Sequence, residues 1–226
     1  MLPVRFKPIY GNGNYRGGKI RSFASMKEMK EKYGIKRIVN LAYDSMEGVS
    51  DFDFSCGVSA GGSNQGNSMP DNACEPLWAK ELGIEFIVAP YIWFAKGYQS
   101  PCIDKGDCPI TDELWKKVRK ALTKGHTYIH CSAGVDRTSA IASRWTLEAD
   151  PNATPTSVIA DAESYAHGWA SGVNQQHYFD DWILQGKPSA SLRRSIIFNQ
   201  YKVPITTIGS VSMLALILYL IKRSKK

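Results

Sequence analysis

The chain has 226 residues, of which 43% are apolar and 22% charged, values that are ordinary for one globular domain with a sizeable core. The formal net charge is +7, but four positive charges lie within the last five residues: Lys222, Arg223, Lys225 and Lys226. The remainder carries only a small positive charge, so the composition gives no support for nucleic-acid binding, and we expect none.

The first predicted elements are a helix over residues 25–33 and a buried strand over residues 35–41. Ser25 is placed to cap the helix, and Gly34 is placed to end it. Residues 1–20 are rich in Gly, Asn and Tyr and have no periodic pattern, so we expect a loop before this helix.

A polar stretch over residues 44–72 contains five glycines and no apolar periodicity, which predicts an inserted loop. This loop is either a lid that faces a substrate or simply a mobile loop, and we expect the mobile loop. A short helix over residues 75–82, which ends at Gly83, and an apolar strand over residues 84–89 follow it.

The helix over residues 112–124 is the most clearly marked element. Thr111 can cap its first turn, and Gly125 lies just beyond its end. One side of this helix is apolar and is expected to be buried: Leu114, Val118, Ala121 and Leu122.

The second half of the chain continues the alternation of strand and helix. Residues 128–130 form a short apolar strand, and a helix follows from about Thr138 to Glu148. Another helix begins at Thr154-Pro155, and a last short one covers residues 178–184. This order predicts an α/β domain over residues 1–200, with a mostly parallel central sheet flanked by helices.

Residues 203–221 contain no charged side chain and are followed directly by the basic tail 222–226. At ~1.5 Å per residue a helix here would span roughly 28 Å, enough for a bilayer core. A basic segment after an apolar span is typical of an anchor, although a buried or interfacial helix is the alternative. We therefore expect a single C-terminal transmembrane anchor, with the domain on the cytosolic side.

The stretch Tyr-Ile-His-Cys-Ser-Ala-Gly-Val-Asp-Arg-Thr, residues 128–138, joins a strand to a helix through a tight loop. Such a loop turns its backbone N–H groups inward at the positive end of the helix, where they can bind a tetrahedral oxyanion. Cys131 at its base would be favoured as a thiolate, which is the nucleophilic form. Arg137 can bind two phosphate oxygens with its planar guanidinium, and Gly134 leaves room for the turn.

This pattern resembles the His-Cys-x5-Arg-Ser/Thr signature of the cysteine-dependent protein tyrosine and dual-specificity phosphatases. The resemblance implies a protein tyrosine phosphatase-like fold, Cys131 as nucleophile and Arg137 as the phosphate-binding arginine. It assigns His130 and Thr138 an assisting role, and it implies that the loop residues between Cys131 and Arg137 bind phosphate: Ser132, Ala133, Gly134, Val135 and Asp136.

In the same family an aspartate ahead of the preceding helix protonates the leaving oxygen. Asp107, which is followed by Pro109, matches that placement better than Asp104 does. The Trp-Pro-Asp sequence of many family members is absent, so either aspartate remains a candidate, and a solvated loop carboxylate is the alternative for both.

Two further stretches carry partial resemblances. The loop sequence Cys-x4-Asp136-Arg-Thr is similar to that of myotubularin-type lipid phosphatases, which implies that Asp136 could orient Arg137 or hold a proton. The alternative is that Asp136 only forms a hydrogen bond at the start of the helix. Tyr15-Arg16-Gly17-Gly18 resembles a segment that many atypical dual-specificity phosphatases carry before their first helix.

We therefore expect a phosphatase that hydrolyses phosphomonoesters through a cysteinyl-phosphate, most simply on phosphoproteins. The alternatives are a phosphoinositide phosphatase and a membrane-tethered pseudophosphatase that only binds phosphorylated groups. No cofactor is implied, and no metal site is predicted, because the four histidines are not near paired cysteines: His126, His130, His167 and His177.

Besides Cys131 the chain has four cysteines, which could form two disulfides: Cys56, Cys74, Cys102 and Cys108. A thiolate nucleophile needs a reducing compartment, and residues 1–5 lead into no apolar run of the kind found in a signal peptide. We therefore expect these four to be thiols.

Overall fold

The computed structural model describes residues 1–41, 70–89, 111–131, 133–166 and 182–200. Within them, strands form one sheet in the order β1-β2-β5-β3-β4. The strands are β1 (Lys7–Pro8), β2 (Tyr15–Gly17), β3 (Arg37–Asn40), β4 (Glu85–Val88) and β5 (Thr127–His130). β1 pairs antiparallel with β2, and the other neighbours are parallel. The predicted α/β class with a mostly parallel sheet is therefore confirmed.

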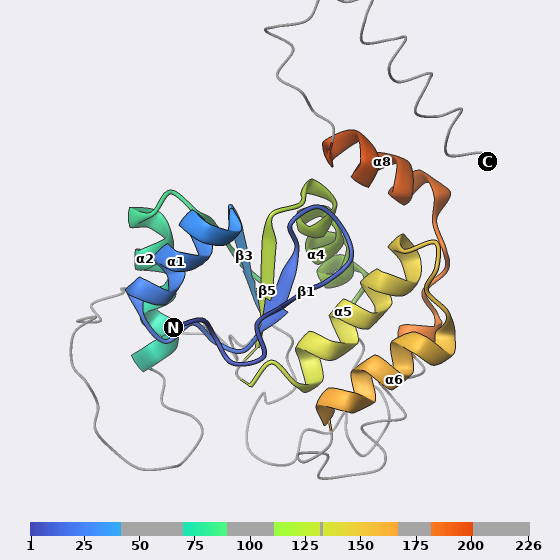
Figure 1. Ribbon diagram of the computed structural model, residues 1–226, viewed down its shortest axis with the longest axis horizontal. Helices are drawn as coiled ribbons and strands as arrows, with labels where there is room; N and C mark the ends of the chain where they lie inside the picture. Colours follow the sequence, from blue (N-terminus) through green and yellow to red (C-terminus); the bar gives the residue numbers. More distant parts are fainter. Residues whose placement is uncertain (42–69, 90–110, 132, 167–181, 201–226) are drawn as a thin grey trace, which may run out of the picture.

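Helices cover both faces of this sheet (Figure 1). On one face lie α1 (Phe23–Tyr33) and α2 (Pro70–Glu81), and on the other lie α4 (Asp112–Lys124) and α5 (Asp136–Ala149). The helix α6 (Pro155–Ala166) packs on α5, and α8 (Ala190–Gln200) contacts both α4 and α5.

The alternation of side chains along the central strands divides the core into two apolar clusters. Ile38 and Tyr128 point to the α1 and α2 side, where they join Met26 and Met29 in one cluster. The next residue on each strand, Val39 on β3 and Ile129 on β5, points the other way into a cluster formed with α4, α5, α6 and α8. Both faces of the sheet are therefore buried, as is usual for parallel strands.

The predicted helix over residues 112–124 is confirmed at both ends. The Thr111 hydroxyl accepts a hydrogen bond from the Leu114 N–H at 3.2 Å, and Gly125 has a φ of +75° at the other end. The buried side of α4 differs by one residue, because Trp115 is buried and Leu114 is only partly so.

Three predicted helix starts need correction. Helix α1 begins at Phe23 because the Ser22 side chain, and not that of Ser25, caps it by accepting the Ser25 N–H at 3.1 Å. Helix α5 begins at Asp136 rather than near Thr138. Helix α2 begins at Pro70, so the last three residues of the predicted loop 44–72 are helical.

Three observed elements were not predicted: β1, β2 and α8. Of the predicted short helix over residues 178–184, only residues 182–184 are described, and they are helical. Most of the loop 44–72, the predicted anchor 203–221 and the basic tail 222–226 lie outside the described residues. Among the helices that are described, none is long and apolar enough to cross a membrane.

Cys74, on α2, is in a disulfide, and its partner lies outside the described residues. The expectation that all four cysteines other than Cys131 are thiols is therefore wrong. The sequence could not show this, because a disulfide depends on how closely the fold brings two cysteines together.

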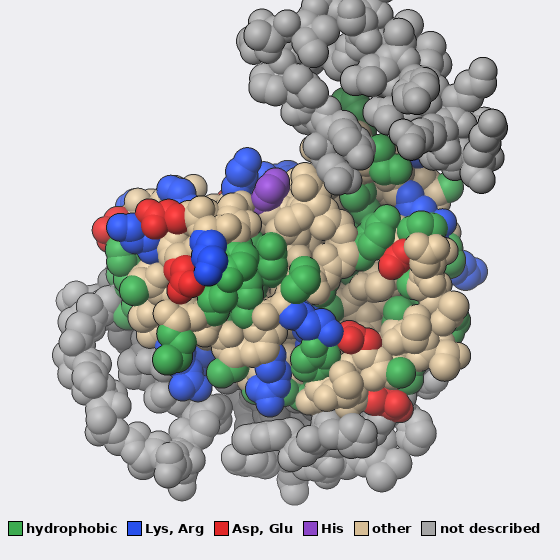
Figure 2. Space-filling model, in the orientation of Figure 1, with side chains coloured by type: hydrophobic (Ala, Val, Ile, Leu, Met, Phe, Trp, Pro, Cys, Tyr) green, Lys and Arg blue, Asp and Glu red, His purple; other side chains and the backbone are tan. Residues whose placement is uncertain are grey.

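Figure 2 shows Lys and Arg side chains interspersed with Asp and Glu over one face of the molecule. Ion pairs on the surface account for some of this mixing, as between Arg37 and Glu85 at 2.8 Å.

Candidate active site

The signature loop begins where the central strand of the sheet ends. Strand β5 lies between β2 and β3 in the sheet and ends at His130, and α5 starts at Asp136. Cys131 is therefore at the carboxyl edge of the sheet, directly in front of the amino end of a helix of fourteen residues. This edge is where α/β proteins bind ligands, and the helix end favours an anion.

Gly134 gives the loop its turn. Its φ is +72°, a conformation that residues with a side chain rarely adopt. A Cβ atom here would also lie 2.5 Å from the backbone nitrogen of Gly18, so there is no room for one. The N–H of Gly134 forms a hydrogen bond to the sulfur of Cys131, so the turn brings a backbone donor to the nucleophile.

Cys131 is only 3% exposed and is a free cysteine. Burial alone would raise the pKa of its thiol. The charge of Arg137, the Thr138 hydroxyl and the N–H groups of Thr138 and Gly134 outweigh that effect, so its pKa lies below the ordinary value. The predicted preference for the thiolate thus has an identifiable physical basis.

Arg137 lies in the first turn of α5 and is 8% exposed. Its Nη1 donates a hydrogen bond to the Leu41 carbonyl oxygen, just beyond β3, at 3.1 Å. This bond ties the guanidinium to the carboxyl edge of the sheet on the same side as Cys131. Thr138, the next residue, is fully buried, and its hydroxyl helps to lower the pKa of the Cys131 thiol.

His130 belongs to a buried polar network that the sequence did not indicate. Its Nε2 lies 3.1 Å from Oε2 of Glu75 on α2, and its Nδ1 lies 3.1 Å from the carbonyl oxygen of Cys131. Glu75 also accepts hydrogen bonds from the Asn40 side chain and from the Ile20 N–H, each at 2.9 Å. His130 and Glu75 have no exposed surface. Burying either side chain without the other would leave a polar group without a partner, which is costly in free energy.

The network determines the charge of His130. Burial lowers the pKa of its imidazole, but the charge of Glu75, their hydrogen bond and the Cys131 carbonyl raise it, and the net direction is upward. This imidazole lies next to Cys131, and when it is protonated it favours the thiolate. No local sequence signal marks Glu75, because only the fold shows that its carboxylate is buried against His130.

The structure brings most of the predicted site residues together in one buried cluster, with the partly buried Ala133 beside it. The cluster consists of His130, Cys131, Gly134, Val135, Arg137 and Thr138. Two arginines that were not predicted, Arg5 and Arg16, contact the same loop. The predicted acids Asp107 and Asp104, the residue Ser132 and the side chain of Asp136 lie outside the described part. No group of three His, Cys, Asp or Glu residues in the described ranges could hold a metal ion.

Comparison with known proteins finds the same fold but no close relative. No family model matches the chain, and no curated protein is similar to it. The core catalytic domain of the PP-IP phosphatase SIW14 from S. cerevisiae is 16% identical, with a TM-score of 0.53 over 90% of this chain and 97% of that one. A DUF442 protein of Shewanella putrefaciens CN-32 is 12% identical, with a TM-score of 0.51 over 81% and 92% of the two chains.

The fold is therefore that of the cysteine-dependent, protein tyrosine phosphatase-like phosphatases, as the signature indicated. At sequence identities this low, the comparison establishes a shared fold and nothing about the activity. The chemistry must be argued from the residues at the carboxyl edge of the sheet.

Proposed function

We propose that the protein is a cysteine-dependent phosphatase that hydrolyses phosphomonoesters through a cysteinyl-phosphate intermediate. The observation that carries this proposal is a buried cysteine directly before the amino end of a helix, in a loop that also brings in the buried Arg137. These surroundings lower the pKa of its thiol. A structural cysteine in an apolar core would have a raised pKa, because burial disfavours the charged form.

The reaction has two displacement steps. In the first, the thiolate of Cys131 forms a bond to phosphorus while the ester P–O bond breaks, and a general acid gives the leaving oxygen its proton. In the second, water attacks phosphorus and loses a proton to the same carboxylate. The P–S bond breaks, and inorganic phosphate and the thiolate are released. The loop N–H groups and Arg137 stabilise the charge on the equatorial oxygens in both steps.

The test is turnover of p-nitrophenyl phosphate by the Cys131→Ser variant. We expect hydrolysis to be abolished and binding of inorganic phosphate to persist, because the loop N–H groups and Arg137 remain. Hydrolysis that survives this substitution would refute the proposed nucleophile. An unmodified protein that binds phosphate without turnover would instead support the pseudophosphatase alternative.

Asp107 is the proposed general acid, with Asp104 as the alternative. Replacing the true acid by asparagine should lower kcat by about 100-fold or more for a phosphotyrosine peptide. The loss should be much smaller for an aryl ester whose leaving group needs no proton. If neither Asp107→Asn nor Asp104→Asn shows this dependence on the leaving group, the acid is elsewhere.

Phosphotyrosine and dual-specificity protein substrates are the proposed class. The phosphoinositide alternative is favoured by Asp136, which matches the lipid-phosphatase loop pattern. A panel of phosphopeptides, phosphoinositide headgroups and a PP-IP, the substrate class named for SIW14, decides between them by kcat/KM. Headgroup turnover at the background rate would reject the lipid alternative.

The membrane anchor over residues 203–221 is likewise a proposal, supported by its uncharged length and the basic tail after it. The 226-residue chain should float with phosphatidylcholine vesicles in a density gradient, whereas a chain ending at Gln200 should not. The proposed cytosolic side conflicts with the Cys74 disulfide, because disulfides persist mainly in oxidising compartments. Protease protection in sealed membranes would show on which side the domain lies.

A further inference from the structure

The segment Tyr15–Gly18 lies against the outer side of the signature loop. Strand β2 runs parallel to β5, with Arg16 opposite Ile129 and Gly17 opposite His130, so both strands end together. Gly17 and Gly18 then pass so close to Gly134 that no Cβ atom would fit between them.

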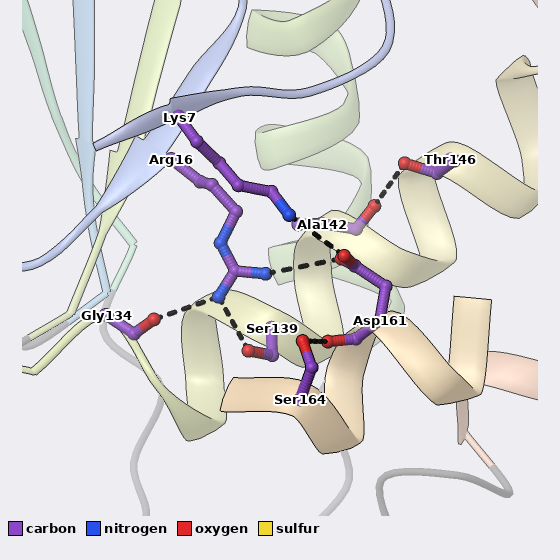
Figure 3. A network of polar contacts seen from close by, with 8 residues as sticks. All are labelled: Lys7, Arg16, Gly134, Ser139, Ala142, Thr146, Asp161 and Ser164. Carbon is purple, nitrogen blue, oxygen red and sulfur yellow. Dashed lines mark hydrogen bonds and ion pairs between the residues drawn. The ribbon is translucent and has the colours of Figure 1, made fainter. Parts of the chain in front are cut away.

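The side chain of Arg16 reaches from β2 under this loop and has no exposed surface (Figure 3). Its Nη2 donates hydrogen bonds to the Gly134 carbonyl oxygen at 2.9 Å and to the Ser139 hydroxyl at 2.6 Å. One guanidinium therefore connects the loop to the first turns of α5.

This contact determines where the backbone N–H groups of the loop point. A trans peptide is planar, so its C=O and the following N–H point in opposite directions. When Arg16 holds the Gly134 carbonyl outward, the N–H of Val135 is turned inward. Arg5 does the same one residue earlier, because its Nη1 donates to the Ala133 carbonyl at 3.0 Å, and the following N–H is the Gly134 donor that bonds the Cys131 sulfur.

The other side of the Arg16 guanidinium is held by α6. Its Nη1 lies 3.9 Å from Oδ2 of Asp161, and its central carbon lies 4.0 Å from the centre of the Tyr165 ring. Asp161 is itself fixed by Lys7 of β1, whose Nζ lies 2.9 Å from Oδ1. The arginine is thus enclosed between the loop and α6 (Figure 3).

A residue that only filled this space would not need a charge. The Nε and Nη1 atoms of Arg16 are buried without a hydrogen-bond acceptor in the described part, which is costly. Burial lowers the pKa of its guanidinium, and the nearby thiolate of Cys131 is one of the charges that oppose this effect. The free-energy cost of burying these atoms and the electrostatic coupling of Arg16 to Cys131 both indicate that Arg16 has a role in the site.

We propose that Arg16 is a positioning residue of the phosphate loop: it holds the Gly134 carbonyl outward, so that the loop N–H groups face the nucleophile and the bound phosphoryl group. Asp161 and Tyr165 keep its guanidinium in place. This inference rests on the proposed phosphatase function. It also gives the Tyr-Arg-Gly-Gly segment a specific purpose.

The test measures alkylation of Cys131 by iodoacetamide over a range of pH, with and without inorganic phosphate. The pH midpoint reports the pKa of the thiol, and protection by phosphate reports the affinity of the loop. The variants are Arg16→Met, which is neutral, and Arg16→Lys, which keeps the charge without the planar fork. Arg144→Met is the matched control, because Arg144 is partly buried in the same domain but donates to Glu148 and to the Trp182 carbonyl rather than to the loop.

We expect Arg16→Met to weaken phosphate protection by about 10- to 100-fold, as for the loss of a charge-assisted hydrogen bond, and to raise the alkylation midpoint. Arg16→Lys should fall between Arg16→Met and the unmodified protein, and Arg144→Met should change the stability but neither reading. A folded Arg16→Met variant with unchanged protection and midpoint would overturn the inference. Should that variant fail to fold, unchanged readings for Arg16→Lys overturn it instead.

These readings do not depend on turnover. If the Arg16 variants behave like the unmodified protein while Cys131→Ser abolishes hydrolysis, the phosphatase proposal stands and this inference fails. If the unmodified protein neither binds phosphate nor hydrolyses an ester, the phosphatase proposal itself fails.

Discussion

The buried carboxylate of Glu75 offers a direct test of how the protein supports its nucleophile, and the substitution is Glu75→Gln. The carboxylate faces donors on every side: the Ile20 N–H, the Asn40 amide and Nε2 of His130. Glutamine has nearly the same size but carries an NH2 group in place of one oxygen. In either orientation that NH2 group faces a donor, so at least one buried donor loses its acceptor.

The expected loss in free energy of unfolding is about 3–5 kcal/mol, the range for removing one partner of a buried ion pair. An unsatisfied buried donor alone costs about 1–3 kcal/mol, and the charge of His130 adds to it. A domain of this size is stable by about 5–15 kcal/mol, so the variant should still fold.

The loss in free energy of unfolding should depend on pH, and the direction of this dependence follows from the pKa of His130. Its pKa is raised in the folded protein above the ordinary 6.5. The stabilisation is therefore complete below that value and disappears as the pH rises through the folded pKa. The difference between the parent protein and Glu75→Gln should be largest at acid pH and should shrink as His130 loses its proton.

The assay is urea unfolding from about pH 5.5 to about pH 8.5, on either side of the ordinary histidine pKa. Both proteins should carry Cys131→Ser, so that the thiol does not titrate in the same range. Glu81→Gln is the matched control, because Glu81 lies on the same helix and is exposed. A loss below about 1 kcal/mol, the size of one ordinary hydrogen bond, or a loss that does not vary with pH, would refute the role given to Glu75.

Three further outcomes follow from the loop. Gly134→Ala should lower kcat/KM by about 100-fold, because it displaces the backbone donors of the loop. Gly83→Ala is the control and should leave kcat/KM unchanged, because Gly83 also has a positive φ but has nothing within 4 Å of a new Cβ. Equal effects of the two substitutions would contradict the packing argument. Thr138→Val should raise the pH midpoint of Cys131 alkylation, because it removes a hydroxyl donor to the thiolate, and an unchanged midpoint would mean that this bond has no influence. Because the pKa of Cys131 is lowered on folding, its thiolate adds stability that is complete above the ordinary thiol pKa and is lost as the pH falls through the folded pKa. The free energies of unfolding of the parent and of Cys131→Ser, measured in urea, should therefore diverge as the pH rises. A difference that does not vary with pH would refute the lowered pKa.

The parts of the structure that could be predicted are those specified by neighbouring residues. Helix α4 has a cap, an apolar side and a terminal glycine within its own sequence, so both of its ends were predicted correctly. The signature loop is similarly local, because its nucleophile, glycine, arginine and helix start all occur within eleven residues.

The parts that were missed depend on residues far apart in the chain. Strands β1 and β2 are two and three residues long, too short to show a period, and β2 exists because it pairs with β5. Glu75 and Arg16 are ordinary charged residues in the sequence. Only the fold shows that one is buried against His130 and the other against Gly134.

The partnership between Arg16 and Gly134 has a consequence for how the protein is made. The two residues are 118 positions apart, so the chain must be synthesised at least as far as Gly134 before they can meet. Until β2 docks beside β5, the Gly134 carbonyl lacks the Arg16 contact that is proposed to hold it outward. The full reactivity proposed for the finished protein therefore requires a long-range contact, and chains that have not yet made it are less prone to the oxidation and alkylation that an acidic thiol undergoes.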